Sequence, residues 1–236
     1  MTSFTFLNSN FIFKEINFLE ISLVIKSLSP GSKILADVAN KFLEKSREML
    51  AYHHSANMVL LRGFSARPSL PTMNDVYKLK AAAISTYPMY RGLATVVGME
   101  VLATGAVFED EIKTLRSNWE RYDYFFLHFK DTDAAGEDGD FERKVKSFEH
   151  LDSLLGQITD LKPDVIVVTG DHSTPATLKG HSWHPVPLIV AGKYCRTDDV
   201  IEFSERGCLR GGLGHIQAVD IMPIAMANAL KLGKFG

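Results

Sequence analysis

Hydrophobic residues recur at helical spacing in several parts of the chain. Residues 32–50 carry apolar side chains every three or four positions and follow the turn-forming segment 29–31, a pattern that predicts an amphipathic helix. A second helix is predicted after Asp140, whose carboxylate suits the N-cap position. Its expected apolar face comprises Phe141, Val145, Phe148, Leu151, Leu155 and Ile158. A further helix is expected at about 218–232.

Short continuous apolar runs predict buried strands at 122–129, 165–168 and 187–191, with a shorter one at 58–61. Residues 16–25 are also compatible with a strand. Because these runs alternate with amphipathic helices, the sequence predicts an α/β fold with a mostly parallel sheet flanked by helices.

The segment 76–99 is rich in alanine near its start and contains a proline. Its alanine-rich stretch at 80–83 predicts the start of a helix that Pro88 would break, and a second helical stretch is expected after the proline. Upstream of it, residues 63–71 contain two prolines and read as a connector between two subdomains.

Composition excludes several classes of function. The chain has 236 residues and a formal net charge of −2, with acidic and basic residues interspersed, so it lacks the basic footprint of a nucleic-acid or anionic-membrane binder. Polar residues interrupt the hydrophobic N-terminal segment, which therefore resembles neither a signal peptide nor a membrane span. Cys195 and Cys208 are interpreted as structural and suit a reducing compartment. We therefore expect a cytoplasmic protein whose partners are small molecules or proteins.

Three polar segments follow predicted strands. Asp171 and His172 come directly after the run 165–168, the acidic cluster 131–140 follows the run 122–129, and His181 lies a short distance beyond His172. Ligands of parallel sheets bind beyond the carboxyl ends of the strands, so the three segments predict one shared metal site.

Within these segments some choices remain open. Asp133 is the best oxygen donor of the acidic cluster, which we expect to form a loop, and Glu137 is the next. Spacing alone cannot choose between His181 and His184. Carboxylate and imidazole ligands without thiolates suit Mn²⁺, Zn²⁺ or Mg²⁺, with Mg²⁺ least favoured. The alternative to a metal site is that the acidic cluster is only a solvated surface and that Asp171 caps the next turn.

These segments carry a resemblance to a known family. The sequence resembles the cofactor-independent (2,3-bisphosphoglycerate-independent) phosphoglycerate mutases, in particular their archaeal-type branch, which belongs to the alkaline phosphatase superfamily. The matching segments are 57–63, 87–94 with Gly98 and Met99, 128–133, 136–140, 170–175 and 181–187.

The resemblance implies an alkaline-phosphatase-like sheet and a reaction that interconverts 3-phosphoglycerate and 2-phosphoglycerate in glycolysis and gluconeogenesis, through a phosphoserine and two divalent metals. It implies that Asp133, Glu137 and His181 bind one metal and that Asp171 and His172 bind the other. Manganese is favoured over zinc or magnesium. Glu137 stands where the family commonly has histidine, which could shift the preference toward harder ions. Arg62, Arg91 and Lys130 are implied to hold phosphate or carboxylate groups.

A second departure concerns the start of the sequence. No residue upstream of Ser29 resembles the family's aspartate metal loop or its serine loop, so the nucleophilic serine and one ligand are expected to be missing. The sheet is then expected to be incomplete at its N-terminal side. We divide the chain into a leader at 1–28, a remnant of an inserted α+β subdomain with its linker at 29–67, and the C-terminal part of the metal-binding domain at 68–236.

The leading interpretation is the C-terminal portion of a metal-dependent phosphoglycerate mutase, with doubtful activity by itself. The alternatives are a noncatalytic protein that binds metal or phosphate, and a subunit completed by a partner chain that supplies the N-terminal half.

Overall fold

A computed structural model describes residues 24–54, 57–61 and 64–233. The chain divides into two compact units, Met1–Pro68 and Ser69–Gly236. The expected strand at 16–25 lies outside the described residues, except for its last two, which belong to no strand. The assignment of the first unit to an inserted subdomain stays a prediction.

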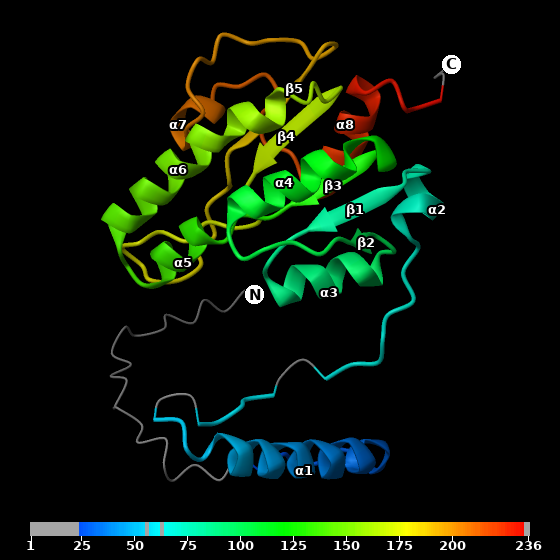
Figure 1. Cartoon of the computed structure of the whole chain (residues 1–236), viewed down its shortest axis with the longest axis vertical. Coiled ribbons are helices and arrows are strands. Elements are labelled where there is room, and N and C mark those ends of the chain that lie inside the picture. The colour runs from blue at the N-terminus through cyan, green and yellow to red at the C-terminus, as the bar shows by residue number, and fades with distance from the viewer. Residues whose placement is uncertain (1–23, 55–56, 62–63, 234–236) are drawn as a thin grey trace, which may run out of the picture. The chain divides into compact units, whose positions relative to one another are not determined.

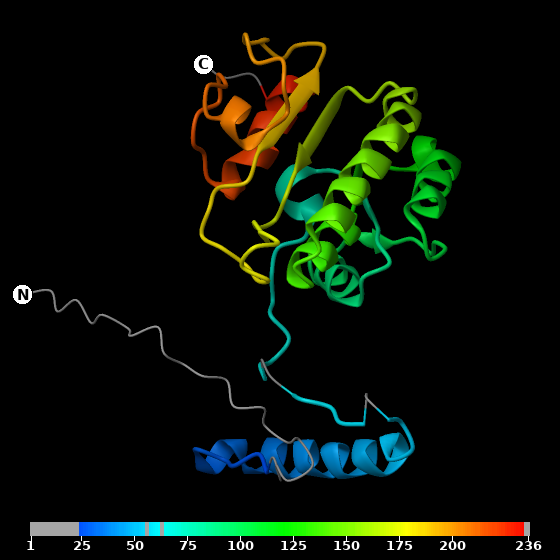
Figure 2. The ribbon, with the colours of Figure 1, turned by 90° about the vertical axis from the view of Figure 1, so that its left-hand side faces the viewer.

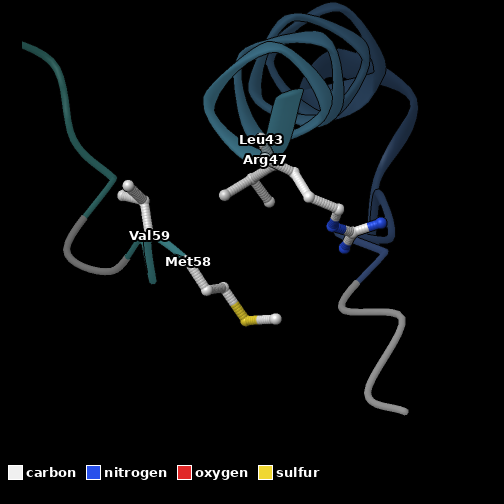
Figure 3. A pocket seen from close by; sticks show the side chains of 4 residues that line it. All are labelled: Leu43, Arg47, Met58 and Val59. Carbon is white, nitrogen blue, oxygen red and sulfur yellow. The ribbon is translucent and has the colours of Figure 1, made fainter. Parts of the chain in front are cut away.

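The first unit contains one long helix. A 3₁₀ turn at Pro30–Ser32 leads into α1 (Lys33–Leu50), which confirms the helix predicted there. The predicted strand at 58–61 is wrong, because these residues form no regular structure and find no strand to pair with in the described part of the unit. Met58 and Val59 instead face Leu43 and Arg47 of α1 across a small pocket (Figure 3).

The second unit holds the strands and most of the helices (Figure 1). Its strands are β1 (Ala81–Ile84), β2 (Glu100–Val101), β3 (Tyr124–Leu127), β4 (Val165–Thr169) and β5 (Leu188–Gly192). Its helices are α2 (Met73–Tyr77), α3 (Pro88–Val96), α4 (Phe108–Asn118), α5 (Asp131–Glu137), α6 (Phe141–Thr159), α7 (Glu205–Cys208) and α8 (Ile221–Asn228). Further 3₁₀ turns are Trp119–Arg121 and Ala218–Asp220.

The strands form two separate ladders, of which Figure 2 shows the pair β4-β5 clearly. One is a parallel sheet in the order β2-β1-β3, and the other is the antiparallel pair β4-β5. Helices α3 and α4 both contact β1. They connect β1 to β2 and β2 to β3, so the right-handed rule for such crossovers expects them on opposite faces of the sheet. The fold is therefore α/β with a parallel sheet flanked by helices, as the sequence predicts.

The central strand β1 corrects one prediction. Its residues Ala81, Ala82 and Ala83 were expected to begin a helix, yet they are buried between β2 and β3. Alanine has the highest intrinsic helix propensity, but its small side chain also lets α3 and α4 approach the middle of the sheet. Ala82 and Ile84 form the main core cluster with Leu102, Leu115 and Tyr122.

Most of the other predicted elements are confirmed. Strands β3, β4 and β5 fall on the predicted apolar runs, and Pro88 occupies the first turn of α3, where its missing N–H is tolerated. The Asp140 carboxylate accepts a hydrogen bond from the Arg143 backbone and caps α6 as expected. The predicted C-terminal helix is shorter, because α8 ends at Asn228 and Leu230 adopts a positive φ of 56°. In the described part of the chain, no helix is long and apolar enough to cross a membrane.

Candidate metal centre

Asp133 and Glu137 lie on α5, just beyond the carboxyl end of β3. The acidic segment was predicted to be a loop, and that prediction is wrong for Asp131–Glu137. Because the two residues are four positions apart in a helix, their side chains share one face. A loop would not impose that alignment, so the helix explains how both carboxylates reach one site.

The chain segment after β4 brings Asp171 and His172 to the same place. The backbone N–H of His172 donates to the Asp171 carboxylate at 3.0 Å, which fixes the turn. The imidazole then lies between two carboxylates, with Nε2 3.4 Å from Asp171 Oδ2 and Nδ1 3.7 Å from Asp133 Oδ1. The segments that follow β3 and β4 therefore meet at His172.

His181 returns to the site because the chain doubles back on itself. An isolated antiparallel bridge joins Ser173 to Ser182, with Ser182 N donating to Ser173 O at 2.9 Å. This bridge sets the His181 ring against the His172 ring, at a centroid distance of 3.7 Å. His184 instead stacks on Trp183 and lies 2.9 Å from the Ser182 hydroxyl through Nδ1.

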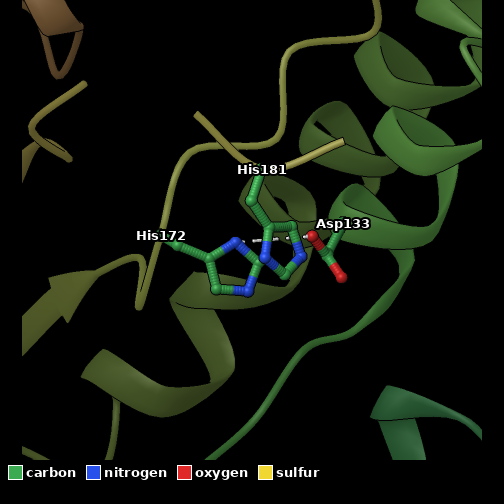
Figure 4. Close-up of side chains that lie close together, drawn as sticks. All are labelled: Asp133, His172 and His181. Carbon is green, nitrogen blue, oxygen red and sulfur yellow. Dashed lines mark ion pairs between the residues drawn. The ribbon is translucent and has the colours of Figure 1, made fainter. Parts of the chain in front are cut away.

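Asp133, His172 and His181 form a cluster that could hold a metal ion (Figure 4). Each offers one ligand atom, and the three atoms lie within 4.8 Å of one another. Glu137 adjoins the cluster, since its Oε1 is 3.7 Å from His181 Nε2. With Asp171 beside His172, all the predicted ligands are contiguous. One carboxylate oxygen and two imidazole nitrogens fit Mn²⁺ or Zn²⁺ better than Mg²⁺.

Lys130 is the predicted substrate residue that reaches this cluster. Its ammonium forms an ion pair with Asp133 and lies 3.9 Å from Glu137 Oε2. Burial works against the charged form of Asp133, but hydrogen bonds from Lys130 and Thr174 outweigh it, so the pKa of Asp133 lies below its ordinary value. Arg91 is exposed on α3, and its guanidinium forms no ion pair or hydrogen bond with the described residues of the cluster. Arg62 lies outside the described residues.

Thr174 is a residue of the site that sequence reasoning missed. Its buried hydroxyl donates a hydrogen bond to Asp133 Oδ1 and lies 3.1 Å from His172 Nδ1. The Lys144 ammonium donates to the carbonyl oxygens of Thr132 and Thr174 at 3.1 and 2.9 Å, which ties α5 to the segment after β4. The sequence offered one signal for Thr174. It lies two residues after His172, in a segment that resembles the mutases.

Gly136 allows that segment to approach α5 closely. A Cβ at this position would lie 2.3 Å from the carbonyl oxygen of Thr174. A larger residue would push Thr174 away from Asp133, so the glycine is required by close packing.

A second buried polar group lies near the carboxyl ends of β1 and β3. Glu111 on α4 is 2% exposed and accepts a hydrogen bond from the Thr86 backbone at 3.1 Å. Burial is the main cause that raises the pKa of Glu111 to about 7, and burial also lowers the pKa of His128 to about 4. The His128 ring lies against the Tyr90 ring in a tilted arrangement, with a centroid distance of 3.9 Å. Nothing in the sequence pattern distinguished Glu111 from the other acidic residues at the start of α4.

Known proteins with similar sequences span more than this chain. Two bacterial relatives are named as probable 2,3-bisphosphoglycerate-independent phosphoglycerate mutases. The protein of Thermosipho melanesiensis is 51% identical over 211 residues, which cover 89% of this chain and 52% of the relative. A protein of Thermus thermophilus is 50% identical over 217 residues, which cover 91% and 53%. The chain thus spans about half the length of these relatives.

Two solved structures have a fold similar to that of this chain. The PH0037 protein from Pyrococcus horikoshii superposes with a TM-score of 0.76 at 35% identity, over 88% of this chain and 60% of the other. The cofactor-independent phosphoglycerate mutase from Thermoplasma acidophilum superposes with a TM-score of 0.59 at 22% identity, over 87% of this chain and 55% of the other. The second likeness concerns the fold alone.

The site and the sequence point to the same family. The model of the Metalloenzyme superfamily matches residues 19–228, a range that includes every ligand predicted above. With carboxylates and imidazoles gathered beyond the ends of β3 and β4, the chain belongs to the Metalloenzyme superfamily.

Proposed function

We propose that this chain supplies the metal-binding part of a phosphoglycerate mutase, an isomerase that interconverts 3-phosphoglycerate and 2-phosphoglycerate in glycolysis. One observation carries the proposal: Asp133, His172 and His181 converge in a chain about 50% identical to proteins named as such mutases. The interconversion of two cytoplasmic metabolites also suits a cytoplasmic protein.

Two divalent ions, preferably Mn²⁺, are proposed for the cluster. Asp133, Glu137 and His181 would hold one, and Asp171 and His172 would hold the other. The contiguity of these side chains supports this division, although His172 lies close enough to Asp133 to contribute to either ion. Such ions would neutralise negative charge on a phosphoryl group in transfer.

Lys130 is proposed to orient the substrate, with Arg62 and Arg91 as further ligands of its phosphate or carboxylate. In the structure the Lys130 ammonium pairs with Asp133 and approaches Glu137. Metal binding to those carboxylates would draw their charge away from Lys130. The freed ammonium could then donate hydrogen bonds to a phosphate oxygen within reach of the same site.

The phosphoserine step needs the nucleophilic serine of the family's serine loop, and no mutase-like segment of this chain resembles that loop. In the proposed reaction the phosphoryl group passes from one substrate hydroxyl to that serine and returns to the neighbouring hydroxyl. We propose that the serine comes from a polypeptide segment outside this chain, which completes the enzyme.

The test is a ³¹P NMR assay of 3-phosphoglycerate with Mn²⁺, using the chain alone and the chain refolded with the rest of the T. melanesiensis relative. We expect 2-phosphoglycerate only with the second polypeptide. Release of inorganic phosphate would identify a hydrolase instead. Metal binding without either product would favour a noncatalytic protein that binds metal or phosphate.

A further inference from the structure

The ammonium of Lys144 connects α6 to both segments that carry the metal ligands. It donates hydrogen bonds to the carbonyl oxygen of Thr132 at 3.1 Å and to that of Thr174 at 2.9 Å. Thr132 directly precedes Asp133 on α5, and Thr174 lies two residues after His172. One side chain therefore fixes the spacing between the two parts of the chain that supply Asp133 and His172.

Gly136 leaves the room that this contact needs. A Cβ at position 136 would lie 3.0 Å from the Lys144 ammonium nitrogen and 2.3 Å from the Thr174 carbonyl oxygen. Glycine inside a helix is unfavourable relative to alanine, so α5 loses stability where these groups meet. Both α5 and α6 are therefore shaped for the meeting of this ammonium with the segment after β4.

The Lys144 side chain is half-buried, so its ammonium gives up part of its hydration. Burial lowers the pKa of Lys144, while the carboxylates of Asp133 and Glu205 favour its charged form. Hydrogen bonds from a charged donor are stronger than neutral ones and compensate for the lost water. Lys146 is exposed on the same helix and forms no hydrogen bond or ion pair within the described part of the chain. The contact thus belongs to position 144 and is not a general property of lysines on α6.

Metal binding would leave the Lys144 contacts in place. Among the described residues, the Lys144 ammonium donates to main-chain oxygens alone, whereas Lys130 pairs with the Asp133 carboxylate itself. A divalent ion on Asp133 would compete with Lys130 but not with Lys144. Lys144 is therefore suited to hold the site both before and after a metal binds.

Thr174 carries the effect of this contact to the ligands. Its carbonyl oxygen accepts from Lys144, and its buried hydroxyl donates to Asp133. The hydroxyl has one hydrogen, so its oxygen accepts the bond from His172 Nδ1, which lies 3.1 Å away. In a neutral ring protonated at Nδ1, Nε2 keeps the lone pair that binds a metal. The position of the Thr174 backbone thus decides whether its hydroxyl can orient both ligands.

We propose that Lys144 is a positioning residue of the metal centre. Its ammonium holds the Thr174 segment against α5, and Thr174 in turn holds His172 in the tautomer whose Nε2 is free for a metal. Without the ammonium, the segment after β4 can move away from α5, and the hydroxyl no longer meets Asp133 and His172 together. The inference deepens the proposed function and rests on it for the bound ion.

The experiment is a long-range ¹H–¹⁵N NMR spectrum of the His172 imidazole in the metal-free, ¹⁵N-labelled full chain. At about pH 8, above the ordinary pKa of an imidazole, the nitrogen shifts distinguish the two neutral tautomers. The unmodified chain should show the Nδ1–H pattern. Lys144→Met keeps the aliphatic stem but has no donor, so its signals should shift toward those of a mixture of tautomers.

Two further variants serve as controls. Lys144→Arg keeps a charged donor and should restore the Nδ1–H pattern. Lys146→Met makes the same replacement at the exposed position on α6 and should match the unmodified chain. In a titration with Mn²⁺, Lys144→Met should bind about 10-fold more weakly, at the lower end of the range for residues that orient metal ligands. A merely structural role would lower the free energy of unfolding but would leave the tautomer of the folded chain unchanged.

An unchanged Nδ1–H pattern in Lys144→Met would overturn the inference, because Lys144 would then support the fold and not the ligand. A mixed pattern in the unmodified chain, or an equal shift in Lys146→Met, would also overturn it. If Lys144→Met does not fold, Lys144→Gln replaces it and is judged by the same signals, since its shorter side chain cannot reach both carbonyl oxygens. Absence of Mn²⁺ binding by the unmodified chain would contradict the proposed function alone, because the tautomer is measured without metal.

Discussion

The Thr174 hydroxyl donates a hydrogen bond to the Asp133 carboxylate and so joins the segment after β4 to α5. The same oxygen lies 3.1 Å from His172 Nδ1. A hydroxyl has one hydrogen, so its oxygen must accept the second bond from Nδ1–H. This fixes the neutral His172 ring in the tautomer whose Nε2 is free to bind a metal.

Replacement of Thr174 should therefore weaken metal binding. Thr174→Val keeps the shape but loses the hydroxyl, and we expect affinity for Mn²⁺ to fall by about 10- to 100-fold, as for other partners of metal ligands. Thr174→Ser is the control and should retain most of the affinity. Isothermal titration with Mn²⁺ measures both, and equal affinities for the valine and serine variants would contradict the role.

His181 and His184 provide a matched pair, because they lie in the same loop. His181→Ala should lower Mn²⁺ affinity by about 100-fold or more, since even partners outside the metal shell are worth about 10- to 100-fold. His184→Ala should have a small effect, because that ring stacks on Trp183 away from the cluster. The same titration decides, and the reverse ranking would remove His181 from the proposed ligands.

Gly136 and Gly156 are both helical glycines with opposite surroundings. A Cβ at Gly136 would meet Thr174 O at 2.3 Å, whereas one at Gly156 meets nothing within 4 Å. Gly136→Ala should lower the free energy of unfolding by about 1–3 kcal/mol through overpacking. Gly156→Ala should raise it by up to about 1 kcal/mol through helix propensity. Urea unfolding compares them, and equal effects would mean that α5 can move away at no cost.

The strands around the site were predictable because their apolar runs are continuous, as at Val165–Thr169 and Tyr124–Leu127. Helix α6 was predictable from its periodicity and from Asp140. The central strand β1 was not predictable in this way. The high helix propensity of its three alanines favours a helix, whereas their burial in the sheet favours a strand. Helix α5 was missed because acidic residues and Gly136 are typical of loops.

Side chains that act through tertiary contacts could not be found in the same way. Thr174 matters because α5 brings Asp133 to it, and Glu111 matters because α4 buries it near the end of β1. Neither contact has a spacing rule in the sequence. The ligands themselves stood out because several residues of suitable chemistry follow strands whose carboxyl ends share an edge.

Glu137 gives a prediction about metal choice. Its carboxylate lies 3.7 Å from His181, at a position where histidine is common in the mutases that the sequence resembles. Glu137→His should shift preference from Mn²⁺ toward Zn²⁺, since imidazole suits the softer ion. Competition between the two metals, followed by mass spectrometry of the native protein, measures the shift. An unchanged preference would place Glu137 outside the metal shell.

Glu111 should make stability depend on pH. Its pKa is raised from 4.5 to about 7, mainly by burial, so the folded state keeps a proton that the unfolded state has released across this window. Stability must then fall as pH rises from 4.5 to about 7, by about 3 kcal/mol at most, since each pKa unit corresponds to about 1.4 kcal/mol. Glu111→Gln should remove this loss.

The shifted pKa of His128 makes stability depend on pH in the opposite sense, so its contribution must be separated from that of Glu111. Its pKa is lowered from 6.5 to about 4, so its contribution to stability is lost as pH falls through that range. The Glu111→Gln variant keeps His128, and subtracting the two profiles of unfolding free energy isolates the carboxyl group. Urea unfolding between about pH 5 and pH 8 should give a difference that grows in favour of the variant up to about pH 7 and then levels off, because Glu111 is ionised in both states above its folded pKa. A constant difference would mean that Glu111 ionises normally in spite of its burial.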